Sequence, residues 1–177
     1  MGFERLEQSL VDVIKEEQAK LGFREENIRL YYPLSSLNHF FEAEDTEEEM
    51  AERLEHLPGE LTAKLGKIEV SHKKERFCFL IPPEGSVYVH EHTADNEFIR
   101  ELIALVGTHG CTLQDIIGLF EKYTDNVICE KIDNGEFDYL LRFPEEMGDS
   151  YYYCFKDEGC HIIYHRFLPE DYADFDF

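Results

Sequence analysis

The chain has 177 residues and carries 39 acidic against 17 basic side chains, for a net charge of −22. So much negative charge repels phosphate and leaves few cations to displace counterions, which excludes nucleic acids and anionic membranes as expected partners. Hydrophobic residues make up 43% and aromatic residues 14% of the sequence, enough to build a core, so a largely disordered chain is excluded as well. Five cysteines without repeated spacing, and the absence of any apolar run near the ~20 residues of a membrane span, predict a cytoplasmic protein with reduced thiols.

The length predicts one domain over residues 1–177. We expect the α+β class, with N-terminal and central helices packed on antiparallel sheet and a four-strand meander near the C-terminus. The predicted segments are 1–60, mainly helical; 67–92, a hairpin plus a strand; 94–123, two helices; 127–167, the antiparallel meander; and 168–177, an acidic aromatic tail.

Three helices are predicted in the first third of the chain. Apolar residues recur at helical spacing between Phe3 and Leu21, and Pro33 suits the first turn of a short second helix. Thr46 and Glu49 have the spacing of a capping box, which predicts a third helix over 47–57. The many acids of this third helix are interpreted as a solvated face.

Strand patterns begin at Ile68. The sequence alternates on both sides of Lys73-Lys74, and pairing Val70 with Phe77 places the apolar residues on one face. Residues 87–90, Val-Tyr-Val-His, are then predicted to form a third short strand.

Two helices follow. Thr93 or Asp95 is expected to cap the first helix, and Thr112 with Asp115 forms a second capping box before a helix over 113–123. The buried face of the first of these helices is expected to consist of Phe98, Ile99, Leu102, Ile103 and Val106.

The dipeptide Asn134-Gly135 predicts a tight two-residue hairpin turn. Counting outward from this turn places Ile128 opposite Leu141, and Lys131 opposite Asp138 as a cross-strand ion pair. Two more strands are expected around residues 157–159, which completes the meander.

The order helix, turn, helix, hairpin is also that of a helix-turn-helix with a wing. The helix in the recognition position, residues 113–123, offers one cation, Lys122, and the hairpin tip carries Asp133 and Glu136. Because affinity for DNA depends on cations that neutralise phosphate, we predict no nucleic-acid binding through this shape.

The segment His109-Gly110-Cys111 is the candidate catalytic pair. A thiol at the start of a helix beside an imidazole is a usable nucleophile if its pKa is lowered, with His109 as the base. The alternative interpretation is that Cys111 is a small buried residue before a helix cap and His109 an ordinary loop residue.

Histidines supply the candidate metal ligands. His90 and His92 are two residues apart on a predicted strand, so both imidazoles would face one side. His161 and His165 are spaced to share a face of another strand, with Cys154 and Cys160 nearby in sequence. The alternative interpretation is that all four are partly exposed residues of a half-solvated sheet. No motif for a cofactor is present, and none is predicted.

The stretch IRLYYPLSSLNHFF, residues 28–41, resembles a family of short uncharacterised proteins from anaerobic Gram-positive bacteria. The resemblance implies a bacterial cytosolic origin. Since that family has no assigned activity, cofactor or partner, it adds no site residues.

The function predicted from these observations is a non-catalytic protein-binding or regulatory module, and the negative surface favours a basic protein partner. The alternative is a small enzyme that uses Cys111 with His109, or a metal held by His90 and His92. A third hypothesis is that the acidic surface mimics DNA. The sequence does not determine the oligomeric state.

Overall fold

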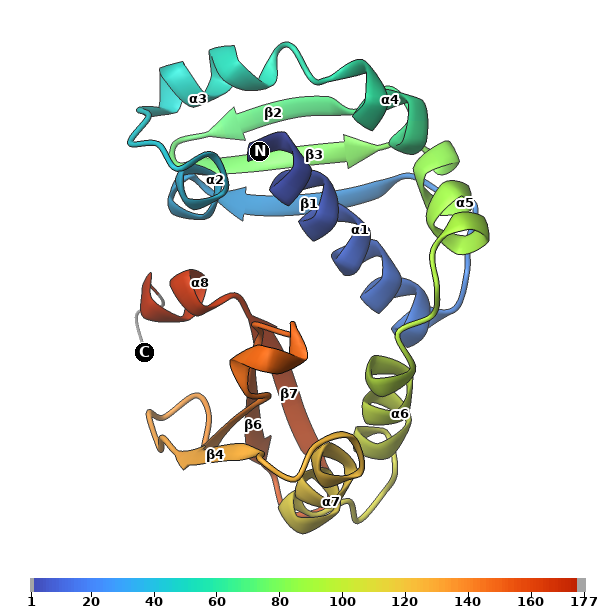
Figure 1. Ribbon diagram of the computed structural model, residues 1–177, viewed down its shortest axis with the longest axis vertical. Helices are drawn as coiled ribbons and strands as arrows, with labels where there is room; N and C mark the ends of the chain where they lie inside the picture. Colours follow the sequence, from blue (N-terminus) through green and yellow to red (C-terminus); the bar gives the residue numbers. More distant parts are fainter. Residues whose placement is uncertain (1, 175–177) are drawn as a thin grey trace. The chain divides into compact units, whose positions relative to one another are not determined.

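The structure is a computed structural model that describes residues 2–174. The chain divides into two compact units, residues 1–96 and residues 97–177, and each unit is described by itself. The single domain predicted from the length stays a prediction. The α+β class is confirmed, because both units combine helices with antiparallel sheet and the second sheet is a four-strand meander (Figure 1).

From residue 2 to residue 96, the first unit contains five helices and a three-stranded sheet in the order β1-β3-β2. Its elements are α1 (Gly2–Leu21), β1 (Ile28–Pro33), α2 (Leu34–Phe41), α3 (Glu47–Leu54), α4 (Gly59–Leu65), β2 (Glu69–Lys73), β3 (Arg76–Ile81) and α5 (Pro83–His92).

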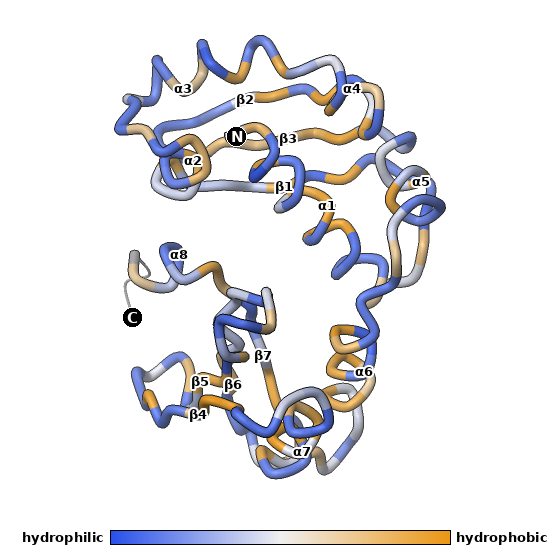
Figure 2. The backbone as a smooth tube through the Cα atoms, viewed as in Figure 1, coloured by the Kyte–Doolittle hydropathy of each residue, from blue (hydrophilic) through white to orange (hydrophobic). Residues whose placement is uncertain are grey.

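One face of the first sheet is covered by helices. The inward residues of β3, Phe77, Phe79 and Ile81, are fully buried, because they alternate with outward residues along the strand. Helix α1 crosses this face, and its buried stripe includes Leu6 and Leu10 (Figure 1). The hydropathy pattern follows the same logic, since β3 is mostly hydrophobic and α3 mostly hydrophilic (Figure 2).

The predicted strand at residues 87–90 is wrong, because these residues lie within α5. Pro82 occupies the N-cap and Pro83 the first turn of the helix, where a missing N–H costs nothing. Gly85 then allows close packing on α4, since an added Cβ would lie 2.8 Å from the carbonyl oxygen of Leu65. Tertiary packing therefore overrides the β propensity of Val87-Tyr88-Val89.

The first hairpin forms as predicted, but its register is shifted by two residues. Val70 lies opposite Phe79 rather than Phe77, and residues 74–75 form the turn. A shift of two keeps each side chain on its predicted face. Strand β1 and helix α4 were not predicted. The β1 residues Leu30 and Tyr32 alternate with exposed neighbours, but this strand pairs with β3, about fifty residues later in the chain.

Within residues 97–174, the second unit contains three α-helices, a short 3₁₀ helix and a four-stranded sheet in the order β4-β5-β6-β7. Its elements are α6 (Glu97–Val106), α7 (Leu113–Tyr123), β4 (Ile128–Lys131), β5 (Tyr139–Arg142), η1 (Glu145–Met147), β6 (Tyr152–Asp157), β7 (Ile162–Phe167) and α8 (Pro169–Asp174). Both helices predicted over 94–123 and both capping boxes are confirmed. The predicted tail is the helix α8 up to residue 174, and the rest of it lies outside the described residues.

Hydrophobic side chains are buried on both faces of the sheet of the second unit, although β4 and part of β7 remain exposed. On one face, Phe120 of α7 and Phe98 of α6 meet Tyr153 of β6, with ring centroids 4.8–5.5 Å apart in edge-to-face contacts. On the other face, a cluster of Phe137, Leu140, Cys154 and Phe167 is completed by Tyr172 of α8 and other partly buried hydrophobics.

The register predicted for the second hairpin is wrong by one residue. Lys131 lies opposite Tyr139, so it does not face Asp138. The cause is a bulge, because the backbone N–H groups of Ile132 and Asp133 both donate to the carbonyl oxygen of Asp138. Asp133 adopts a left-handed conformation with φ 45°. It is the extra residue that follows β4 on that side of the hairpin. The tight two-residue turn expected for Asn134-Gly135 is therefore replaced by a longer loop.

Among residues 2–174, no helix has both the length and the apolar composition that are needed to cross a membrane.

Candidate functional site

The outer face of the first sheet is exposed, in contrast to the helix-covered inner face. Tyr31 is 52% exposed, and Cys78 and Leu80 are partly exposed in the centre of the sheet. These three side chains help to line one broad hollow of about 840 Å³. We call this surface the open sheet face. Its three rows across the strands are Arg29–Leu80–Glu69, Tyr31–Cys78–Ser71 and Pro33–Arg76–Lys73.

Three cations gather on the open sheet face although the chain is strongly acidic. The three rows contain three basic residues and one acidic residue. The basic residues are Arg29, Lys73 and Arg76, and the acidic residue is Glu69. The guanidinium of Arg76 lies 4.8 Å from the centroid of the Tyr31 ring, an arrangement typical of a cation–π contact. This contact orients the arginine along the surface of the sheet.

The cations of the open sheet face also lack carboxylate partners. Among residues 2–174, none of Arg29, Lys73 and Arg76 forms an ion pair with a carboxylate. Elsewhere in the first unit, Lys64 pairs with Glu7 at 2.5 Å and Arg53 with Asp45 at 2.6 Å. In a chain with more than two acids per base, unpaired cations grouped on one exposed face indicate a surface that can receive an external anion.

The candidate catalytic pair lies before α7. Cys111 is buried and its thiol lies 3.7 Å from the carbonyl oxygen of Thr112, while His109 is exposed in the preceding loop. Burial, together with the charges of Asp115 and Asp157, raises the pKa of the Cys111 thiol. Since a nucleophilic cysteine needs a lowered pKa, this environment disfavours the thiolate.

The candidate metal ligands His90 and His92 lie in α5. Two residues apart in a helix differ by about 200° around the axis, so the two imidazoles point to opposite sides. Each ring stacks on a neighbour instead, His90 on Phe23 at 4.1 Å and His92 on Tyr88 at 4.8 Å between centroids. The shared face expected for a strand is lost because the segment is helical.

The other two histidines lie around β7. His161 precedes the strand, and its Nδ1 lies 3.2 Å from the Sγ of Cys160. His165 is within the strand and packs against Phe167, with centroids 4.3 Å apart. Opposite His165, Cys154 is buried, which raises its pKa to about 12.

The structure brings two of these loops together. The N–H of Gly110 donates to the carbonyl oxygen of Cys160 at 3.0 Å, which joins the His109–Cys111 loop to the turn between β6 and β7. Across residues 2–174, however, no group of three or more His, Cys, Asp or Glu side chains is arranged to hold a metal ion.

The sequence reasoning missed the open sheet face. A partial signal existed, because Arg29 and Tyr31 alternate with the buried Leu30 and Tyr32. The face became visible only when β1 was found to pair with β3, which places Arg29 and Tyr31 beside residues from the hairpin.

The chain is thus an α+β protein in which one face of the first sheet is uncovered and locally cationic. The chain belongs to the family described as "Domain of unknown function, E. rectale Gene description (DUF3877)", whose model matches residues 3–175. The resemblance to a family from anaerobic Gram-positive bacteria is thereby confirmed. Comparison with curated proteins and with solved structures finds no match.

Proposed function

We propose that this protein is a non-catalytic protein-binding module, and that the open sheet face binds an acidic, extended segment of its partner. The observation that carries the proposal is the group of three cations without carboxylate partners around an exposed tyrosine. Partner carboxylates would pair with Arg29, Lys73 and Arg76. Apolar partner side chains would cover Cys78 and Leu80, which an isolated sheet leaves partly exposed.

The dimensions of the face support a short extended segment. Three strands and five residues span about 10 Å by 13 Å between Cα atoms. An extended chain advances about 3.3–3.6 Å per residue, so four or five residues cross the face. Alternate side chains of such a segment would point toward the sheet, which suits a pattern of acidic and apolar residues.

The same dimensions disfavour a polynucleotide. Residues 1–96 contain 21 acidic and 11 basic residues, so the surroundings of the face are negative. Phosphates that extend beyond the three cations would meet this negative surface within the Debye length of about 8 Å. A short acidic peptide can end inside the cationic area, whereas a nucleic-acid strand continues past it.

For the open sheet face, the proposal replaces the basic protein partner favoured by the net charge with an acidic one. The total of −22 describes the average surface, but a binding face is governed by the charges within a few ångströms of it. On the open sheet face those charges are positive. The partner proposed for this face is therefore acidic.

Peptide binding tests the proposal. The full chain would be titrated with an acetylated (Glu-Leu)₄ peptide and followed by amide NMR shifts, with (Lys-Leu)₄ and single-stranded dT₈ as competing chemistries. We expect the acidic peptide to shift the amides of β1, β2 and β3. Its affinity should weaken as salt is raised from 50 to 300 mM, because exposed charge pairs are screened.

Charge reversal identifies the face. The double variant Arg29→Glu with Arg76→Glu should weaken binding of the acidic peptide at least tenfold. The matched control, Lys15→Glu with Lys67→Glu, makes the same change in net charge at residues that do not line the hollow. Equal weakening in both variants, or preferential binding of (Lys-Leu)₄ or dT₈, would contradict the proposal.

A further inference from the structure

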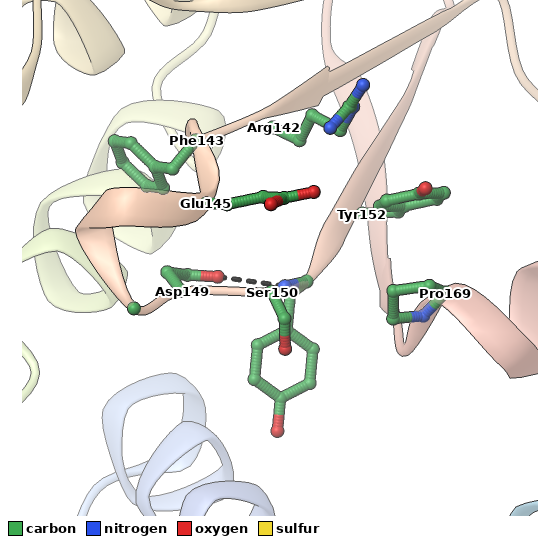
Figure 3. Close-up of a pocket in the computed structure, with 9 residues that line it drawn as sticks. Arg142, Phe143, Glu145, Asp149, Ser150, Tyr152 and Pro169 are labelled. Atoms are coloured by element: carbon green, nitrogen blue, oxygen red, sulfur yellow. Dashed lines mark hydrogen bonds between the residues drawn. The ribbon is translucent and has the colours of Figure 1, made fainter.

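A second opening lies within the second unit, on the face of the sheet that α8 covers. It is a cavity of about 340 Å³, at the small end of the range for ligand sites. Arg142 at the end of β5, Glu145 of η1, Tyr152 of β6 and Pro169 of α8 surround it (Figure 3). The cavity shares no residue with the open sheet face.

One wall of the cavity is held in place by partly buried hydrogen bonds. The hydroxyl of Tyr153, a fully buried side chain, donates to Oδ2 of Asp149 at 2.7 Å. The backbone N–H of Tyr151 donates to Oδ1 of the same carboxylate at 3.0 Å (Figure 3). The guanidinium of Arg166 lies 4.0 Å from the centroid of the Tyr151 ring. Asp149 is therefore committed to the loop, and the position of Ser150 in the wall is set before any ligand arrives.

Two side chains of the lining carry opposite charges, and neither is held by hydrogen bonds as Asp149 is. Arg142 has 30% of its side chain exposed, and its guanidinium lies 5.7 Å from the centroid of the Tyr152 ring. Its carboxylate neighbour is Glu130 at 3.9 Å, a distance too long for a direct hydrogen bond. Glu145 is exposed, and its carboxylate points into the space beside Tyr152 (Figure 3). Within the described part of the chain, Arg142 and Glu145 form no ion pair with each other.

We propose that this cavity binds a small zwitterion that carries an ammonium and a carboxylate group, such as a free amino acid with an apolar side chain. The ammonium group of the ligand donates to the carboxylate of Glu145, which lies beside Tyr152 (Figure 3). The carboxylate accepts from the guanidinium of Arg142, whose fork of N–H groups suits two oxygens. The apolar side chain of the ligand covers Pro169.

Ligands with a single charge fit this lining less well. A simple anion would pair with Arg142 but would leave its other side against Glu145. A simple cation would pair with Glu145 but would leave its other side against Arg142. A singly charged ligand pairs with only one of Arg142 and Glu145. The other charged side chain would lose water on binding and gain no partner, which lowers the affinity of the ligand.

The test compares three molecules of the same skeleton with the full chain. L-Leucine carries both charges, isopentylamine lacks the carboxylate, and 4-methylpentanoate lacks the ammonium group. Amide NMR shifts of residues 149–152 would be followed during each titration. We expect L-leucine to shift these amides and to bind at least tenfold more tightly than either analogue.

Two variants separate the two charges. Arg142→Gln should weaken L-leucine at least tenfold, and Glu145→Gln should do the same. Glu146→Gln is the matched control, since Glu146 is exposed but does not line the cavity, and it should leave binding unchanged. Thermal unfolding of each variant would show that it is folded. The absence of shifts at 50 mM L-leucine, equal binding of an analogue, or an equal effect of Glu146→Gln would overturn the proposal. None of these results bears on the open sheet face.

Discussion

The two units of this chain build an antiparallel sheet with helices in different ways. In the first unit helices bury one face of the sheet, and the other face remains exposed with Tyr31 at its centre. In the second unit α6 and α7 cover one face, while α8 and the hairpin loop contribute to the other. The first unit therefore leaves a broad exposed surface, for which we propose an extended partner, whereas the second leaves a confined cavity, for which we propose a small molecule.

The cores differ as well. The interior of the first unit joins aliphatic helix residues such as Leu6, Leu10 and Ile14 to the sheet. The interior of the second unit is centred on the rings of Phe98, Phe120 and Tyr153. Aromatic rings bury more surface per residue and prefer defined edge-to-face angles. The second core therefore depends on fewer and larger side chains.

The largest expected effect comes from removing a central ring of the second unit. Phe120→Ala should lower the free energy of unfolding by about 3–5 kcal/mol, while Leu10→Ala in the first unit should lower it by about 2–5 kcal/mol. Hydrogen exchange monitored by residue would show which unit each variant loosens. Each unit is expected to lose protection alone. Equal loss in both units after either change would mean that the two cores unfold as one.

The capping boxes offer a smaller and closely matched comparison. Thr46 in the first unit and Thr112 in the second both accept from the backbone N–H of the third helical residue, which in turn reaches back to the cap. Thr46→Ala and Thr112→Ala should each cost about 1 kcal/mol in denaturant unfolding. Thr62→Ala removes a partly buried threonine within α4 that occupies no N-cap, and it serves as the reference. A cap variant with no more effect than Thr62→Ala would contradict the role assigned to that cap.

The smallest expected effect on stability belongs to the open sheet face. Tyr31→Ala should lower the free energy of unfolding by no more than about 1 kcal/mol, because the side chain is half exposed and its cation–π contact with Arg76 lies on the uncovered face. Its neighbour Tyr32 is buried and its hydroxyl lies 2.9 Å from the Ser9 hydroxyl, so Tyr32→Ala should cost about 3–5 kcal/mol. Chemical denaturation measures both. A large loss for Tyr31→Ala would show that this face is covered in the folded chain.

Several features followed directly from the sequence because short-range physics determines them. The capping boxes at Thr46 and Thr112, the apolar periodicity of α1, α6 and α7, and the hairpins of the meander all depend on residues close together in the chain. The α+β class and the order of the final four strands could therefore be predicted before the structure was known.

Other features depended on contacts that no local pattern contains. Packing of Gly85 against α4 made residues 87–90 helical, and the bulge at Asp133 moved the second hairpin by one residue. These changes separated His90 from His92 and removed the pairing of Lys131 with Asp138. Candidate sites that rest on register or on strand geometry were therefore the least reliable part of the sequence reasoning.

By itself, the sequence determined where most helices begin and which residues could be buried, because capping and periodicity act within a few residues. The tertiary structure alone decided that β1 joins β3, that three cations share an exposed face, and that Arg142 and Glu145 line one cavity. The reason is physical: strand pairing and the convergence of charges are set by packing between residues tens of positions apart, and the energies that select them are spread over the whole unit.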